Sequence, residues 1–184
     1  AATGRAALGL YGKMPGVALA DYVHARLIGV WGTNPSATGI HFIPCVQEAQ
    51  RRGAKLVVVD PRRTPLAKHA DLHLAPRPGG DLPLALAVVR WLFENGKADL
   101  EFLARHTTGA EELRRRASAW TLDRAAEAAA VPATDIEAFA RLYAETQPAA
   151  IRCGWGLERN RNGGSAVAAV LALPAVAGKF GVRG

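Results

Sequence analysis

A short polar loop near the start of the sequence offers groups that could bind a ligand. It follows an almost wholly apolar run, residues 27–31, and consists of Gly32, Thr33, Asn34, Pro35 and Ser36. The glycine permits a close backbone approach, the proline disfavours a helical conformation at the residue before it, and the three polar side chains supply short donors and acceptors. We therefore predict a ligand-binding loop at the end of a buried strand.

Two carboxylates stand at comparable places further along. Asp60 follows the unbroken apolar run 56–59, which is typical of a strand buried on both faces. Asp81 closes the turn PRPGGD and precedes an apolar helical stretch, residues 82–95, so its carboxylate is expected to cap that helix and to complement its dipole. Carboxylates in such positions can accept hydrogen bonds from a nucleotide.

These groups require an alternation of strands and helices to position them. One helix is expected over residues 38–52, with Gly53 just past its end, which gives a βαβ unit. Further strands are expected at 71–75 and 148–153, and shorter helices at 17–24 and 66–69. Residues 98–147 are expected to be helical, with breaks at Trp120, Val131 and Pro132 and with capping boxes beginning at Thr108 and Thr134. The predicted fold class is a three-layer α/β/α domain spanning residues 1–184, with a doubly wound, mostly parallel sheet of Rossmann-like topology and an added helical segment. Ligands of such sheets bind beyond the carboxyl ends of the strands.

A third junction between a strand and a glycine-rich loop lies near the end of the chain. The sequence GWGLERNRNGG follows residues 148–153, and Arg159 and Arg161 within it could bind an anion. The GxGxxG fingerprint occurs nowhere, which weakens the case for a nicotinamide cofactor. An NAD(P)-binding or other nucleotide-binding Rossmann-like domain stays open as an alternative.

Composition limits the other classes. The chain has 184 residues and a net charge of +7, but its 23 lysines and arginines are spread along the sequence, so a basic nucleic-acid-binding module is only an alternative and no nucleic-acid partner is expected. The two cysteines, Cys45 and Cys153, lack metal-binding spacing. His69, Asp71 and His73 alternate and could bind a metal, but solvated edge polarity explains them more simply. No stretch predicts membrane insertion.

Four motifs in a fixed order resemble those of the molybdopterin oxidoreductase family, the dimethyl sulfoxide reductase group that includes formate dehydrogenases and nitrate reductases. They are WGTNP at 31–35, GAK at 53–55 leading to DPRRT at 60–64, AD at 70–71 and RPGGD at 77–81. Each motif alone is weak, but their order and spacing are specific and cover nearly the whole chain. PGGD stands where the family usually has PGTD, and Arg159 stands where members commonly have glutamine.

The resemblance implies that the domain holds one of two molybdopterin guanine dinucleotides. It assigns residues 32–36 to the diphosphate and ribose region, Asp60, Arg62 and Asp81 to the guanosine end, and Trp155, Gly156 and Arg159 to the neighbourhood of the pterin. The implied cofactor-binding residues are Gly32, Thr33, Asn34, Pro35, Ser36, Asp60, Pro61, Arg62, Thr64, Gly79, Gly80, Asp81, Trp155, Gly156 and Arg159.

The family's metal ligand would lie upstream of the position of Ala1, and neither Cys45 nor Cys153 matches it. We therefore expect a fragment of a larger multidomain molybdenum or tungsten oxidoreductase, inactive when isolated and without catalytic or metal-binding residues of its own. The implied partners are the remaining domains of the same subunit and an iron–sulfur electron-transfer subunit; an iron–sulfur cluster could also lie elsewhere in the parent chain. A cytoplasmic location is expected, or a periplasmic one if an export signal lies upstream.

Overall fold

Four short parallel strands form the centre of the computed structural model, which describes residues 2–184. They are β1 (Leu27–Trp31), β2 (Lys55–Val59), β3 (Leu72–Leu74) and β4 (Ala149–Cys153), in the order β3-β2-β1-β4. In the register of this sheet Trp31 lies opposite both Val59 and Cys153. Leu74 lies opposite Val59, so all four strands end together and their carboxyl ends form one edge.

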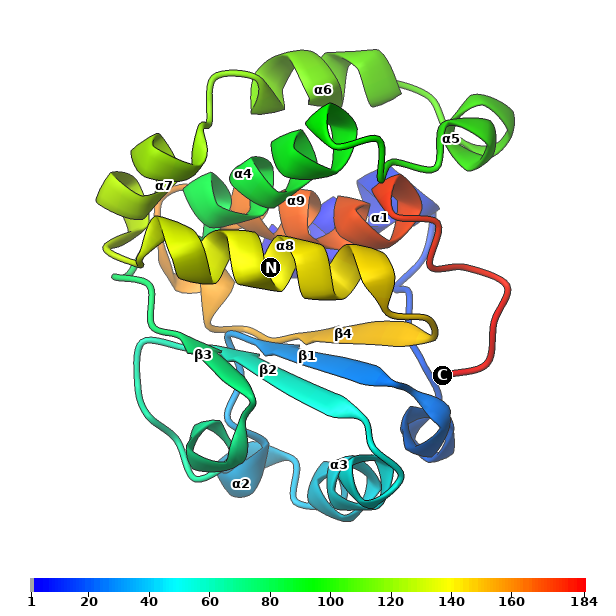
Figure 1. Cartoon of the computed structure of the whole chain (residues 1–184), viewed down its shortest axis with the longest axis vertical. Helices are drawn as coiled ribbons and strands as arrows, with labels where there is room; N and C mark the ends of the chain where they lie inside the picture. The colour runs from blue at the N-terminus through cyan, green and yellow to red at the C-terminus, as the bar shows by residue number, and fades with distance from the viewer. Residues whose placement is uncertain (1) are drawn as a thin grey trace.

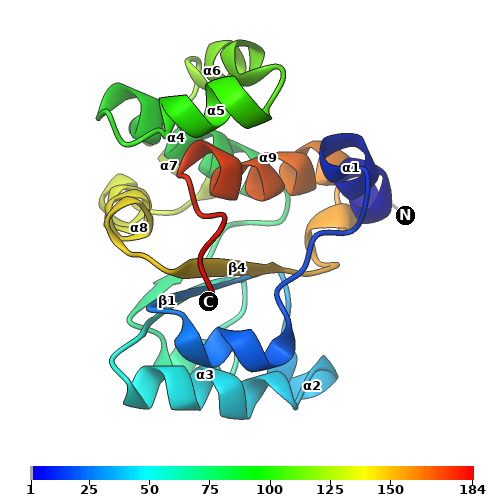
Figure 2. The same ribbon diagram turned by 90° about the vertical axis from the view of Figure 1, so that its right-hand side faces the viewer.

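Helices cover both faces of the sheet (Figures 1 and 2). One face carries the 3₁₀ helix η1 (Leu19–His24), α2 (Pro35–Thr38), α3 (Phe42–Arg51) and the 3₁₀ helix η2 (Ala67–His69). The other carries α1 (Ala2–Tyr11), α4 (Asp81–Glu94), α8 (Ala133–Glu145) and α9 (Gly163–Val176), with α5 (Leu100–His106), α6 (Ala110–Ala117) and α7 (Leu122–Ala129) packed outside them. The three-layer α/β/α prediction is confirmed.

The strands read as continuous apolar runs because both faces of the sheet are buried. Leu27, Trp31 and Val57 pack into the core beneath α4, α8 and α9, whereas Ile28 and Leu56 pack into a second core against α3. All five side chains are at most 1% exposed. Alternate residues of one strand therefore support opposite helical layers.

Several predicted element boundaries were wrong. The helix expected over residues 38–52 is α3, which begins later, at Phe42, and is preceded by the separate short helix α2; Gly53 adopts a left-handed φ of 89° just past α3. The stretch 98–147 has the expected breaks at Trp120 and at Val131 and Pro132, and a further break, not expected, separates α5 from α6. The predicted strand 71–75 is only Leu72–Leu74. The predicted helices at 17–24 and 66–69 are the shorter 3₁₀ helices η1 and η2.

Both predicted capping boxes were also wrong. Helices α6 and α8 start after Gly109 and Pro132, and neither start has a side-chain cap. The caps occur elsewhere: Asp99 accepts a hydrogen bond from Phe102 N at the start of α5, and Thr121 accepts one from Arg124 N at the start of α7.

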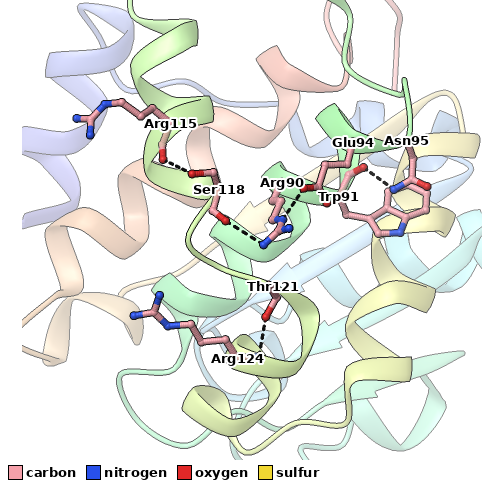
Figure 3. Close-up of polar contacts among 8 residues, drawn as sticks. All are labelled: Arg90, Trp91, Glu94, Asn95, Arg115, Ser118, Thr121 and Arg124. Atoms are coloured by element: carbon pink, nitrogen blue, oxygen red, sulfur yellow. Dashed lines mark hydrogen bonds and ion pairs between the residues drawn. The ribbon is translucent and has the colours of Figure 1, made fainter.

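A polar network ties α4 to the segment between α6 and α7 (Figure 3). Arg90 donates through Nη1 to the carbonyl oxygen of Ser118 at 2.9 Å and through Nε to Glu94 at 2.7 Å. The Ser118 hydroxyl in turn donates to the carbonyl oxygen of Arg115 at 2.8 Å. These bonds satisfy carbonyls at the end of α6 and fix α4, whose first residue belongs to the site described next.

Candidate functional site

The loops that follow the strands meet at the carboxyl edge of the sheet. The chain passes from β1 outward to β2 and β3 and later returns to the other side of β1 as β4, so the strand order reverses between β1 and β4. At that point Gly154 N donates to Trp31 O at 2.8 Å, and Gly156 N donates to Gly32 O at 2.9 Å. Such a reversal is where open α/β sheets bind their ligands.

Gly32 is required by the way these two loops pack. Its φ is 62°, and a Cβ atom at this position would lie 2.0 Å from Leu157 Cδ1. A Cβ on Gly154 would lie 2.3 Å from Thr33 Cβ, and one on Gly156 would lie 2.6 Å from Gly32 O. An extended, β-like backbone at Gly32, which would tolerate a larger residue without loss of stability, is therefore excluded.

Asn34 carries an unsatisfied polar atom in this loop. Its side-chain oxygen is buried and has no hydrogen-bond partner among the described residues, and it does not cap α2. Pro35, the first residue of α2, is buried, whereas Ser36 is partly exposed. A buried acceptor without a partner is costly, so the Oδ1 atom of Asn34 suits a ligand that brings a donor.

Asp60 lies at the end of β2 and is 7% exposed. Its carboxylate accepts a hydrogen bond from Arg62 N at 2.8 Å, and Nε2 of His73 lies 2.9 Å from its carbonyl oxygen. Thr64 is buried, and its hydroxyl oxygen accepts a bond of 3.2 Å from the backbone N–H of Ala67, the first residue of η2. The side chain of Arg62 is exposed beside it, as is Pro61.

Asp81 does not cap its helix, contrary to the sequence prediction. It is the first residue of α4, it makes no capping bond, and it is 9% exposed. Its Oδ1 atom instead accepts a buried hydrogen bond of 2.8 Å from Nε1 of Trp31, 50 residues away. Its place in the first turn still complements the helix dipole.

Burial raises the pKa of Asp81 above its ordinary value. The hydrogen bond from Trp31 acts against this by favouring the charged form, and the neighbouring charge of Asp60 adds to the increase in pKa. Asp60 and Asp81 thus interact, as the sequence placed them, at one end of the site. Cys153, at the end of β4, also faces Asp81, and burial raises its thiol pKa to about 12.

The loop before α4 is held from two sides. Asn162 donates through Nδ2 to Gly79 O at 2.9 Å, and Arg77 N donates to Ala129 O at 2.8 Å. Gly79 has a φ of 88°, and a Cβ on Gly80 would lie 2.8 Å from Ala129 Cα. Both glycines are therefore explained by the fold, and they align Asp81 with the strand ends.

The loop after β4 borders the same edge. Trp155 is 61% exposed, Gly156 and Arg159 are exposed, and Leu157 between them is buried. An exposed indole and a guanidinium at the rim are suited to flat or anionic ligand groups.

The alternative metal site is not assembled. Asp71 bonds to Lys55 Nζ and Leu56 N, and His73 contacts the Asp60 carbonyl, so the three residues 69, 71 and 73 do not converge. Across residues 2–184 no group of three or more His, Cys, Asp or Glu side chains could hold a metal ion. A cavity of about 1110 Å³ lies between α1, α4, α5, α6 and α9 and contains none of the predicted site residues.

Sequence reasoning missed the contributions of Trp31, Asn162 and Leu157. Trp31 was assigned to the apolar strand, yet a buried indole N–H needs an acceptor, and this requirement was a usable signal. Asn162 and Leu157 act through contacts between distant loops, for which the local sequence gives no signal.

The fold is an α/β domain whose loops meet at the carboxyl ends of its parallel strands, the edge at which open sheets of this kind bind their ligands. A family model of molybdopterin oxidoreductases matches residues 10–184, and the chain belongs to this family. It is 34% identical over 169 residues to the probable oxidoreductase YoaE of Bacillus subtilis, covering 92% of this chain and 25% of that protein. It is 31% identical over 164 residues to formate dehydrogenase H of Escherichia coli, covering 89% and 23%.

The structure resembles that of acetylene hydratase from Pelobacter acetylenicus, with a TM-score of 0.86 and 31% identity. The match covers 100% of this chain and 24% of that one. The chain thus spans about a quarter of the length of the relatives that it matches. No helix among residues 2–184 has the length and apolar character needed to cross a membrane.

Proposed function

We propose that this chain is the part of a molybdenum or tungsten oxidoreductase that binds a molybdopterin guanine dinucleotide, with the guanosine end at Asp60 and Asp81. The observation that carries the proposal is Asp81, a buried carboxylate at the ligand-binding edge. Burying a carboxylate without a cationic partner is unfavourable, and hydrogen-bond donors from a bound ligand would offset this cost. Such buried carboxylates are found preferentially at functional sites.

The residues of the edge fit the parts of such a cofactor. Guanine presents N1–H and the N2 amino group side by side, and one carboxylate can accept from both, whereas adenine has no matching donor pair. We assign Asp81 to the base and Asp60 to the ribose, the second because an acid at the end of the second strand takes that role in related folds. The unpartnered oxygen of Asn34 is assigned to a hydroxyl or amino donor in the diphosphate and ribose region.

Two exposed cations of the edge, Arg62 beside Asp60 at the guanosine end and Arg159 on the pterin side, suit an anionic cofactor. When bound, the cofactor supplies the metal at which redox chemistry occurs, and this chain's role is to bind and orient it. The relatives include a formate dehydrogenase, a nitrate reductase and an acetylene hydratase, so family membership does not specify the reaction.

Titration with GDP and ADP tests the guanosine assignment. A bidentate contact to a charged acceptor, at about 1.5–3 kcal/mol per hydrogen bond, should separate GDP from ADP on the order of a hundredfold. Asp81→Asn should abolish most of this preference, and Asp60→Asn should weaken GDP and ADP alike because both contain ribose.

The matched control is Asp123→Asn, which removes an exposed carboxylate from the first turn of α7. It should leave both affinities unchanged. Equal affinity of the unmodified protein for GDP and ADP, or an Asp81→Asn variant with an undiminished ratio, would refute the assignment.

A further inference from the structure

Trp31 reaches from the sheet to the residue assigned to the guanine base. It is 1% exposed at the end of β1, and its ring packs edge-on against Phe139 of α8, with 5.9 Å between ring centroids. Its single polar atom, Nε1, donates to Oδ1 of Asp81 at 2.8 Å. The ring position is thus fixed by β1 and α8, and the donor is directed at α4.

An indole can only donate, and this limits the forms of Asp81 that satisfy it. The neutral acid can also accept this bond through its carbonyl oxygen, but a charged oxygen accepts more strongly, so the N–H favours the carboxylate and holds one rotamer. A carboxylate oxygen accepts more than one hydrogen bond, so this contact leaves Asp81 able to accept a further donor pair.

From this geometry we infer that Trp31 is a positioning residue for base specificity: its indole N–H donates to the Asp81 carboxylate and orients it for a guanine base. The inference rests on the proposed function. The role falls to the indole N–H of Trp31, a residue that otherwise belongs to the apolar core.

The groups around Asp81 oppose its ionisation, and this is why the donor matters. Burial and the charge of Asp60 both favour the neutral acid. The Cys153 thiol, the other titratable group that faces Asp81, has a pKa raised to about 12 and is uncharged at neutral pH. Trp31 is the side chain that favours the charged form, so its N–H should control the pH at which base recognition is lost.

The test is Trp31→Phe, which keeps an aromatic ring against Phe139 and removes the donor. We expect the GDP-to-ADP affinity ratio to fall roughly tenfold at neutral pH, the loss of one hydrogen bond to a charged group. The ratio should also collapse at a higher pH than in the unmodified protein as the pH is lowered. Protonation of the diphosphate affects the GDP and ADP affinities equally, so it cancels in their ratio.

A direct measurement accompanies the binding assay. The Asp81 carboxyl pKa, followed by carbon-13 NMR in the ligand-free protein, should rise in Trp31→Phe. Trp91→Phe is the matched control, because Trp91 is a buried indole of α4 with no hydrogen bond from Nε1 to any described residue (Figure 3). It should change neither the ratio nor the pKa.

If Trp31→Phe does not fold, β-(3-benzothienyl)alanine at position 31 keeps the shape of indole without its N–H. In an Asp81→Asn background, removing the donor should have no further effect on the ratio. A guanine preference that survives Trp31→Phe, or an unchanged Asp81 pKa, overturns the inference alone. Absence of a guanine preference in the unmodified protein overturns the proposed function, and the inference with it.

Discussion

Folding places Asp81 in a buried position that disfavours the charged form of its carboxyl group. Its pKa in the folded chain is raised above the 3.8 of an exposed aspartate, mainly by burial. Its contribution to stability is therefore fully present below that ordinary pKa and is lost as the pH rises through the folded value. The buried, charged acceptor therefore lowers the stability of the fold at neutral pH. Such a loss of stability is common where a residue is retained for binding.

Asp81→Asn should consequently gain stability relative to the unmodified protein as the pH is raised from about 3 to about 7. Asparagine keeps an oxygen that can accept from Trp31 but cannot ionise. Glu112→Gln is the opposite case, because Arg115 and Arg116 lower the pKa of Glu112 to about 2, so this variant should lose relative stability over the same range. Urea unfolding at both pH values measures the two differences; parallel pH dependence of the two variants would contradict the prediction.

Alanine substitutions at Gly32 and Gly53 separate the cost of a left-handed backbone from the cost of a steric clash. Gly32→Ala places a side chain at φ 62° and 2.0 Å from Leu157 Cδ1, so it should destabilise the protein by about 2–4 kcal/mol. Gly53→Ala has the same backbone problem, at φ 89°, but no atom within 4 Å of the new Cβ, so it should cost only about 1–2 kcal/mol. Equal losses of unfolding free energy in the two variants would show that the Leu157 contact yields without cost.

At the scale of elements, the sequence predicted the strands well because burial on both faces leaves a clear signal. Residues 27–31 and 56–59 are continuous apolar runs, and each coincides with a central strand. Asp60 could be placed at the ligand edge for the same reason. The Trp31–Asp81 bond could not be predicted, because it joins residues 50 apart whose proximity depends on how α4 packs on the sheet.

Helix caps show the limit of local patterns. The sequence around Thr134 matches a capping box, yet the N-cap of α8 is Pro132, and Thr134 lies inside the helix. Thr121, which was not recognised, is the actual cap of α7.

Thr121→Ala should therefore cost about 1 kcal/mol of stability, whereas Thr134→Ala should be close to neutral. The first variant leaves Arg124 N without the acceptor that it now has at 3.1 Å (Figure 3). Thermal or urea unfolding measures the loss of stability in both variants. A larger loss for Thr134→Ala than for Thr121→Ala would show that Thr134 caps α8, as the sequence predicted.

For the whole molecule, the net charge of +7 and the local chemistry of the edge should contribute to binding in different ways. The overall charge attracts any nucleotide through its phosphates, and salt screens this attraction, since the screening length falls from about 10 Å at 0.1 M to about 3 Å at 1 M. Hydrogen bonds within a buried contact are screened much less. We expect both GDP and ADP to bind more weakly as salt rises over this range, while the ratio of their dissociation constants stays within about twofold. Calorimetric titration at several salt concentrations measures both quantities. A ratio that approaches one at high salt would mean that the guanine preference arises from long-range charge and not from the carboxylate of Asp81.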